Sequence, residues 1–229
     1  MKQSLFRNAL VTVAAAFAVA SFAPPALAQS EQQKLVDSAD ATLQNFLRDP
    51  DMKWLQQNIG RAKGVLIAPQ IVKAGFIFGG SGGRAVLVAK DPASGRWNGP
   101  AFYALATASV GFQAGVEVSE AITLVMTDKG MNSVLAPSFK IGGDASVAAG
   151  PVGAGAKSDI VADLVAFSRA KGVYGGLNLD GTVVNTSDDW NQAYYGQKVT
   201  STDILVRATT KQQGGQKLVD DVAKAAGGK

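Results

Sequence analysis

Two serines stand in patterns that catalytic nucleophiles use, so they raise the first question about chemistry. Ser81 lies within Gly79-Gly-Ser-Gly-Gly83, which fits the Gly-x-Ser-x-Gly turn of many hydrolases, and Ser168 precedes Lys171 at Ser-x-x-Lys spacing. The 229-residue chain contains neither His nor Cys. A Ser-His-Asp triad, thiol catalysis and the usual zinc and iron–sulfur ligands are therefore excluded. We expect no catalytic residue, no metal and no cofactor.

The local context of both serines also argues against catalysis. A hydrolase turn must be followed by a helix, as must the dinucleotide-binding pattern that residues 80–85 loosely fit, yet residues 84–89 alternate as a strand does. Ser168 lies in another strand pattern, and the chain lacks the Lys-Thr-Gly element that accompanies Ser-x-x-Lys enzymes. A hairpin turn at residues 79–83 explains the glycines without an active site.

A second set of residues could bind phosphate-bearing lipid. Residues 48–73 contain five basic and two acidic residues, with one tryptophan among them. Near an anionic surface each Lys or Arg contributes about 1 kcal/mol, and an indole suits the membrane interface. The alternative is that this segment docks onto the protein core and its cations are merely solvated. The candidate lipid-binding residues are Arg48, Lys53, Trp54, Arg61, Lys63 and Lys73.

Two helices must position most of these cations. Residues 29–60 contain one glycine, at their end, and apolar residues recur there at helical spacing. Asp49 is a predicted N-cap, Pro50 suits the first turn of a second helix, and Gly60 is its expected stop. The apolar face of this second helix consists of Met52, Leu55 and Ile59. The sequence therefore predicts a helical hairpin over residues 29–60.

The rest of the chain has the texture of a β protein. Residues 60–196 hold 22 of the 26 glycines, interleaved with Val, Ile, Phe and Ala in short runs that favour strands and turns. Strands are expected at 64–67, 74–78, 84–89, 101–108, 111–118, 121–126, 138–148, 160–168, 172–179 and 182–184, and turns at 79–83 and 180–181. Helices are expected at 128–135, 188–195 and 211–226. The predicted fold class is α+β, with a twisted antiparallel sheet carrying the N-terminal amphipathic helices. Closure into a barrel or a sandwich is left open.

The first 28 residues have the pattern of a secretory signal. Lys2 and Arg7 precede an apolar run over residues 9–22, and Ala26-Leu-Ala28 forms a cleavage site. An uncleaved anchor is the rival interpretation, but the run is shorter than a bilayer span and is followed by Pro24 and Pro25. We expect residues 29–229 in the periplasm, with residues 29–60 as the hairpin and 61–229 as a glycine-rich β domain. Its 20 basic and 18 acidic residues do not suggest nucleic-acid binding.

A series of short segments between residues 62 and 196 follows one order along the chain, at 62–69, 73–80, 97–102, 109–115, 144–153, 168–176 and 194–196. This series resembles the SYLF-domain family of lipid-binding modules. The resemblance implies a non-catalytic protein that binds anionic phospholipid; eukaryotic members prefer phosphoinositides, and a periplasmic member would use another anionic head group. An envelope scaffold that binds a protein partner or a second copy is the alternative function.

Overall fold

The computed structural model describes residues 29–75, 78–110, 115–153, 160–170 and 179–227, and the structural statements below concern this part of the chain. The N-terminal part of the described chain forms the predicted helical hairpin. Helix α1 (Glu31–Arg48) begins at Ser30, whose side chain accepts a hydrogen bond from the Gln33 amide. After it come η1 (Pro50–Met52), α2 (Lys53–Asn58) and η2 (Ile59–Arg61). The Asp49 side chain caps η1 by accepting from the Asp51 amide at 2.9 Å, which confirms the predicted cap.

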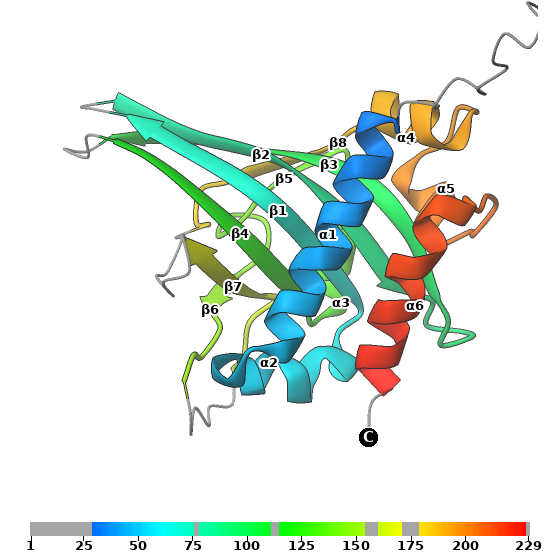
Figure 1. Ribbon diagram of the computed structural model, residues 1–229, viewed down its shortest axis with the longest axis horizontal. Coiled ribbons are helices and arrows are strands. Elements are labelled where there is room, and N and C mark those ends of the chain that lie inside the picture. Colours follow the sequence, from blue (N-terminus) through cyan, green and yellow to red (C-terminus); the bar gives the residue numbers. More distant parts are fainter. Residues whose placement is uncertain (1–28, 76–77, 111–114, 154–159, 171–178, 228–229) are drawn as a thin grey trace, which may run out of the picture.

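Eight strands form one curled sheet, a half-barrel with the spatial order β5-β8-β3-β2-β1-β4-β7-β6. Every neighbouring pair is antiparallel except β6 and β7, which are parallel. The half-barrel confirms the predicted α+β class with its twisted sheet, and Figure 1 shows α1 lying diagonally across one face of that sheet. The strands are β1 (Gly64–Gly75), β2 (Phe78–Lys90), β3 (Trp97–Val110), β4 (Gly115–Val125), β5 (Ser138–Lys140), β6 (Val147–Ala149), β7 (Leu164–Ala170) and β8 (Val183–Thr186).

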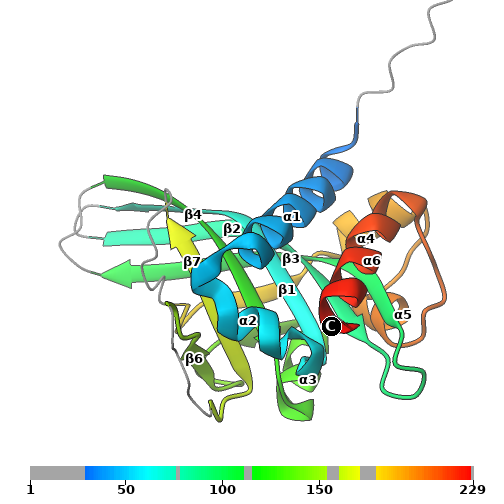
Figure 2. The same cartoon turned by 60° about the horizontal axis from the view of Figure 1, so that its bottom comes forward.

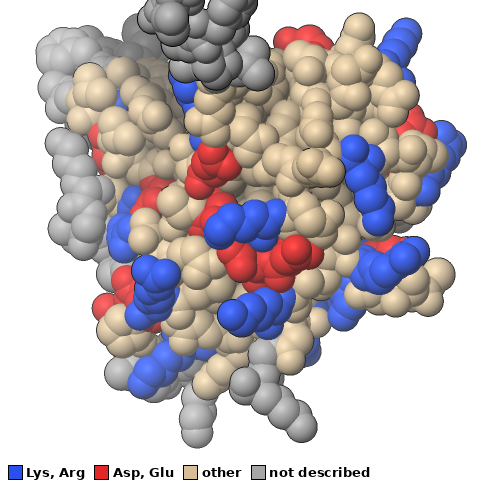
Figure 3. Space-filling view, turned by 45° about the vertical axis from the view of Figure 1, so that its right-hand side comes forward, with Lys and Arg blue, Asp and Glu red and all other residues tan. Residues whose placement is uncertain are grey.

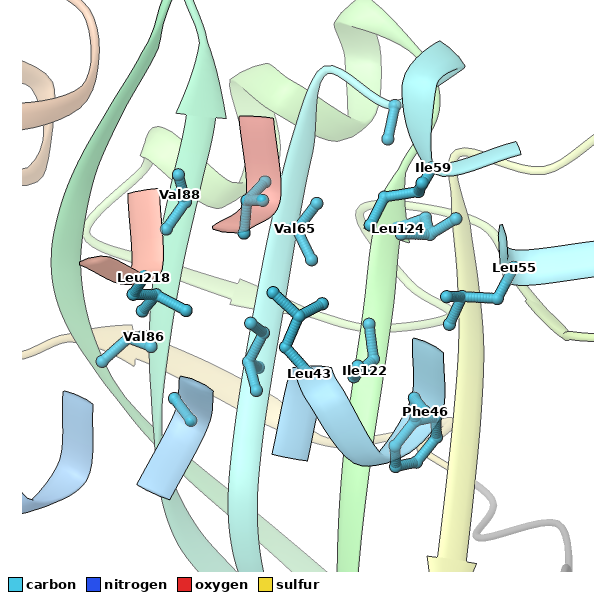
Figure 4. Packing of buried hydrophobic residues seen from close by; sticks show 14 of the residues in the cluster. Leu43, Phe46, Leu55, Ile59, Val65, Val86, Val88, Ile122, Leu124 and Leu218 are labelled. Carbon is cyan, nitrogen blue, oxygen red and sulfur yellow. The ribbon is translucent and has the colours of Figure 1, made fainter. Parts of the chain in front are cut away.

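The central strands are buried on both faces at their helix-covered ends. Alternate residues Val65 and Ile67 of β1 belong to a core shared with α1, α2 and α6, whereas Leu66 and Ala68 belong to a second core on the other face. We call the first face the α1 face; Figure 4 shows Leu43 and Phe46 of α1 packed there over Val65 and Ile122. Because both faces are covered, β1 carries a nearly continuous apolar run at this end.

Four further helices surround the sheet: α3 (Asp128–Leu135), α4 (Asp188–Tyr195), α5 (Ser201–Leu205) and α6 (Gln213–Gly227). The predicted helices at 128–135, 188–195 and 211–226 are thereby confirmed, and Leu218 and Val222 of α6 are fully buried as expected. Helix α5 was not predicted. Its sequence signal is Thr200-x-x-Asp203, which forms a complete capping box. Within the described ranges, no helix has the length and apolarity to cross a lipid bilayer.

The predicted hairpin turn at residues 79–83 is wrong, because these residues lie inside β2. Strand β1 is likewise one strand, where the sequence suggested two, and Pro69 sits at a bulge between Ala68 and Gln70. The bulge brings the Gln70 carbonyl oxygen within 2.4 Å of where a Cβ on Gly83 would stand. Gly83 therefore allows β1 and β2 to approach closely at the bulge, and it does not form a turn.

Other boundaries differ in smaller ways. The strand predicted over 138–148 is divided into β5 and β6 by a turn in which Gly142 has φ +82°. The turn at residues 180–181 is confirmed, with Gly181 at φ +81°. Most of the strand predicted at 172–179, and the first part of that at 111–118, lies outside the described residues.

Strands β1 to β4 are much longer than the helical layer that covers them. Figures 1 and 2 both show their far ends projecting together beyond α1 and α2, away from α6. We call this projection the blade and define it as residues 71–75 of β1, 78–83 of β2, 106–110 of β3 and 115–118 of β4. The blade and the helical hairpin are the two regions on which a functional surface could be built.

Candidate functional site

A charged cluster joins the helical hairpin to the sheet at the base of the blade. The Arg169 guanidinium on β7 donates through Nε to Glu120 Oε1 of β4 at 2.7 Å, and its Nη1 lies 3.8 Å from Asp49 Oδ2. Thr42 of α1 donates to Glu120 Oε2 at 2.9 Å, and the Arg169 guanidinium carbon lies 5.6 Å from the Phe46 ring centroid. The cluster fixes the corner between α1 and α2 against β4 and β7.

The hairpin docks onto the sheet through the apolar face that its sequence predicted. Met52, Leu55 and Ile59 are fully buried in the core of the α1 face. This result supports the alternative interpretation for the inner side of the hairpin, namely that it packs against the protein. Docking of that face leaves only the outer stripe of α2 and η2 available to a ligand.

Trp54 points from α2 into the protein core, so it cannot contact a membrane. Its residue exposure is 7%, and its ring centroid lies 5.8 Å from that of Phe167 on β7. The expectation that this indole contacts lipid is therefore wrong. One position after the exposed Lys53, the helical rotation turns the side chain into the core, where packing on an aromatic ring stabilises it.

Three of the candidate cations remain exposed on the hairpin. Arg48 ends α1, and Lys53 and Arg61 lie eight residues apart on the outer stripe of α2 and η2, with Gln57 between them. Arg61 donates to Asn58 Oδ1 at 3.0 Å, a neutral partner that leaves its charge uncompensated. No ion pair of Arg48, Lys53 or Arg61 with an acid is present within the described residues. We call these three residues the hairpin cations.

Lys63 and Lys73 do not join them. Lys63 forms an ion pair with Asp128 of α3, with Nζ 2.8 Å from Oδ1. Lys73 lies ten residues further along β1, about 30 Å away at the rise of an extended strand, and faces away from α1. The six candidates are thus dispersed: three form the hairpin cations, and the other three are buried, paired or remote.

The surface that the sequence did not reveal is one face of the blade. On its α1 face, Val72, Val116 and Val118 have exposures of 39%, 65% and 38%, and Ala74, Ala106 and Ala108 are exposed beside them. The strand register places Val118, Val72, Gly82 and Ala106 in one cross-strand row, and Val116, Ala74, Gly80 and Ala108 in the next. The sequence signal was available in three of the four strands: Val or Ala alternates with polar residues in β1, β3 and β4, whereas β2 contributes glycines to this face.

Beyond Ile71, which is buried in the second core, the opposite face of the blade is polar. One cross-strand row there consists of Glu117, Lys73, Ser81 and Thr107, so Lys73 lies between the acid on β4 and the serine on β2. Ser81 is thus a strand residue within a polar row, with no helix after it, and this geometry does not match a hydrolase turn. Ser168 is 9% exposed in the middle of β7. The blade is an amphipathic four-stranded element.

A cleft of about 480 Å³ lies at the other end of β2 and β3, where their connection meets α5 and α6. Lys90, Arg96 and Lys211 line it together with Asp220. Figure 3 shows the side of the molecule that carries α6, on which basic and acidic side chains are interspersed. One such group is Lys217, which bridges Asp221 and Asp40; these hydrogen bonds raise its pKa. Because its basic and acidic side chains are mixed, this side is less suited than the hairpin cations to binding an anionic membrane surface.

Comparison with known proteins identifies the family. A model of the Ysc84 family, described as Las17-binding protein actin regulator, matches residues 106–225, slightly more than half of the chain. LAS seventeen-binding protein 3 of Saccharomyces cerevisiae is 34% identical over 152 residues, covering 63% of this chain and 33% of the yeast protein. The human SH3 domain-containing YSC84-like protein 1 is 27% identical over 167 residues, covering 71% and 48% of the two chains. This chain thus spans less than half of either relative, and it belongs to the Ysc84 family, whose domain is the SYLF domain.

Proposed function

We propose that this protein is a non-catalytic module that binds membranes containing anionic phospholipid, in the periplasm after removal of residues 1–28. The observation that carries the proposal is the set of hairpin cations, Arg48, Lys53 and Arg61, which are exposed on α1, α2 and η2 and form no ion pair with an acid in the described structure. Asp49, the nearest acid in sequence to Arg48, is directed to Arg169 instead. The outer stripe around Arg48, Lys53 and Arg61 therefore carries three cations, with Asp49 and Asp51 between them in sequence.

The strength expected of this surface is that of a reversible contact. At about 1 kcal/mol for each cation near an anionic leaflet, the three hairpin cations contribute a few kcal/mol before salt screening. That energy supports transient association and falls well short of permanent anchoring. Family membership supports a binding role, since the family description names a protein partner and a regulatory task, and no catalytic reaction.

Co-sedimentation with vesicles tests the proposal. The variant carrying Lys53→Glu and Arg61→Glu should lose at least about tenfold in apparent binding to vesicles of phosphatidylcholine and phosphatidylglycerol, because it replaces two attractive charges with repulsive ones. A matched control carries Lys140→Glu and Lys198→Glu, which make the same change at exposed positions off the hairpin. Equal pelleting of the natural chain on neutral and anionic vesicles would contradict the proposal, as would equal losses in both variants.

A second candidate function is protein binding, and the sheet edges of the blade favour it. Strand β8 pairs with β3 only over residues 103–106, and β7 pairs with β4 only over residues 119–125. Beyond these residues, both outer edges of the blade lack a strand partner within the described structure, and a free edge can accept an added strand. Crosslinking in intact cells distinguishes the candidates: recovery of one protein partner, or of a second copy, independent of lipid composition would favour this function.

A further inference from the structure

The α1 face of β4 changes character along a single strand. Ile122 lies under α1 and is fully buried, Glu120 contacts Thr42 and Arg169, and Val118 and Val116 then continue the same face into solvent. Apart from Glu120, the hydrophobic pattern thus continues past the helical cover. On a monomeric protein, a contiguous apolar surface of this kind is typical of a site that contacts another phase or another molecule.

Cations border this apolar face at its base. On the side of β1 and β2, Lys34 of α1 and Arg84 of β2 line a groove with Gln70, next to Val72, and Glu31 is the acid in the same groove. On the side of β4 and β7, Arg48 stands at the end of α1 beside the cluster of Arg169 and Asp49. An apolar face edged by basic side chains is complementary to an amphiphile that carries acyl chains and a phosphate.

The polar face of the blade limits how far it could enter a membrane. Its row of Glu117, Lys73, Ser81 and Thr107 contains two ionisable side chains, which are disfavoured in the hydrocarbon core. A sheet with one apolar and one polar face is instead matched to the boundary between head groups and acyl chains, as amphipathic helices are.

We propose that the blade lies flat in the outer part of an anionic bilayer, with Val72, Val116 and Val118 toward the acyl chains and the row containing Lys73 toward water. The inference rests on the proposed lipid-binding function and deepens it, since it assigns the apolar contact to the blade and leaves the electrostatic contact to the hairpin cations and their neighbours. The occupant of the apolar face is lipid, because Lys34, Arg84 and Arg48 border it against Glu31, while Glu120 and Asp49 at the same base are held by Arg169.

Site-specific labelling tests the orientation, and the chain is suited to it because it contains no cysteine. Val116→Cys and Glu117→Cys place a polarity-sensitive fluorophore on opposite faces of the same strand, at two exposed neighbouring positions. On phosphatidylcholine and phosphatidylglycerol vesicles, the label at position 116 should shift to the blue. Lipids that carry a spin label near the head group should quench it at least about threefold more than the label at position 117.

The outcomes separate this inference from the function on which it rests. Anionic vesicles that pellet the protein while both labels respond equally, or not at all, would overturn the blade orientation and leave lipid binding by the hairpin intact. Absence of pelleting would overturn both. A label at position 116 that is shielded by a protein in periplasmic extract, with no response to vesicles, would assign the face to a protein partner and also overturn the inference.

A charge variant provides a second readout. Val116→Asp should weaken binding to anionic vesicles about tenfold, since it removes an apolar contact and adds a charge that the acyl region disfavours. Glu117→Gln changes the adjacent polar position and should bind at least as well as the natural chain. Both positions are exposed, so circular dichroism and thermal melting should confirm that the variants fold. Unchanged binding of Val116→Asp would contradict the proposed contact.

Discussion

The two ends of strand β4 carry similar residues in very different surroundings: residues 119–125 lie in the helix-covered end of the sheet, and residues 115–118 lie in the blade. Ile122 and Val116 are both β-branched and both lie on the α1 face, yet Ile122 is fully buried and Val116 is 65% exposed. What differs is the layer above them: α1 packs over Ile122, whereas the blade, which contains Val116, projects beyond α1 (Figure 1). The comparison teaches that alternation in a strand specifies which face is apolar, whereas a separate element decides whether that face becomes core or surface.

The largest effect expected from this comparison is on stability. Ile122→Ala should reduce the free energy of unfolding by about 2–5 kcal/mol, because it empties space in a fully packed core. Val116→Ala on the same face should change it by less than about 0.5 kcal/mol. Urea denaturation followed by circular dichroism measures both variants. Similar losses at the two positions would show that the blade is covered in solution, and the comparison would fail.

Glycines at the base of the blade allow a sharper test of strand packing. Gly83→Ala should cost about 1–3 kcal/mol, because its Cβ would stand 2.4 Å from the Gln70 carbonyl oxygen at the bulge. Gly82→Ala is the matched control, since its Cβ would meet the Leu105 carbonyl oxygen at an ordinary 3.6 Å. The control should be neutral or slightly stabilising by reducing the freedom of the unfolded chain. If thermal denaturation ranked the two variants in the opposite order, the bulge geometry would be contradicted.

Asp163 should make the stability of the helix-covered end of the sheet sensitive to acid. Its side chain accepts from Thr127 Oγ1 at 2.5 Å, the Ser146 amide at 2.9 Å and Ser146 Oγ at 2.8 Å, and these bonds hold its pKa well below the usual value. Because the folded-state pKa is lowered, this stabilisation is present above the unfolded pKa near about 4 and is lost as the pH falls toward the folded value. Asp163→Asn should cost about 1–2 kcal/mol at neutral pH.

The measurement for Asp163 is a series of denaturation curves between neutral pH and pH of about 3. The natural chain should lose stability more steeply below pH of about 4 than Asp163→Asn, since the variant lacks the titrating group. Identical slopes would mean that the carboxylate is not specifically stabilised in the fold. Asp163 joins β7, β6 and the start of α3, so the change in stability with pH reports on the helix-covered end of the sheet and not on the blade.

The smallest effect is expected at the surface ion pair of the helix-covered end of the sheet. Lys63→Met should change the free energy of unfolding by less than about 1 kcal/mol, because Lys63 and Asp128 have side-chain exposures of 38% and 87%. Their contribution should also decline with added salt. A loss comparable to that of Ile122→Ala, measured in the same denaturation assay, would show that the ion pair, and not packing beneath the helices, stabilises the helix-covered end of the sheet.

Much of the local structure followed from residue patterns. The cap at Asp49, the helix over residues 128–135 and the buried face of α6 were accessible because capping and helical periodicity depend on residues close in sequence. The turn misassigned at residues 79–83 shows the limit. Glycine is required both by turns and by close strand approach, and only the bulge opposite Gly83 distinguishes the two.

The candidate site was only partly predictable for a related reason. Arg48, Lys53 and Arg61 were found from their charge, and their exposure agrees with a surface role. Trp54 was misplaced because a tryptophan among cations suits an interface and a core equally well until the docking of α2 is known. Lys63 and Lys73 were grouped by sequence proximity, although an extended strand separates them.

By itself, the sequence determined the absence of histidine and cysteine chemistry, the positions of most helices and the glycine-punctuated β character of the region between them. These properties depend on residue type and short-range spacing. Only the tertiary structure decided that four strands outrun their helical cover, that two rows of Val, Ala and Gly meet across them, and that the cations divide between hairpin, sheet and ion pair. Those results depend on strand register and on where α1 ends above the sheet, which are set by contacts between residues distant in the chain.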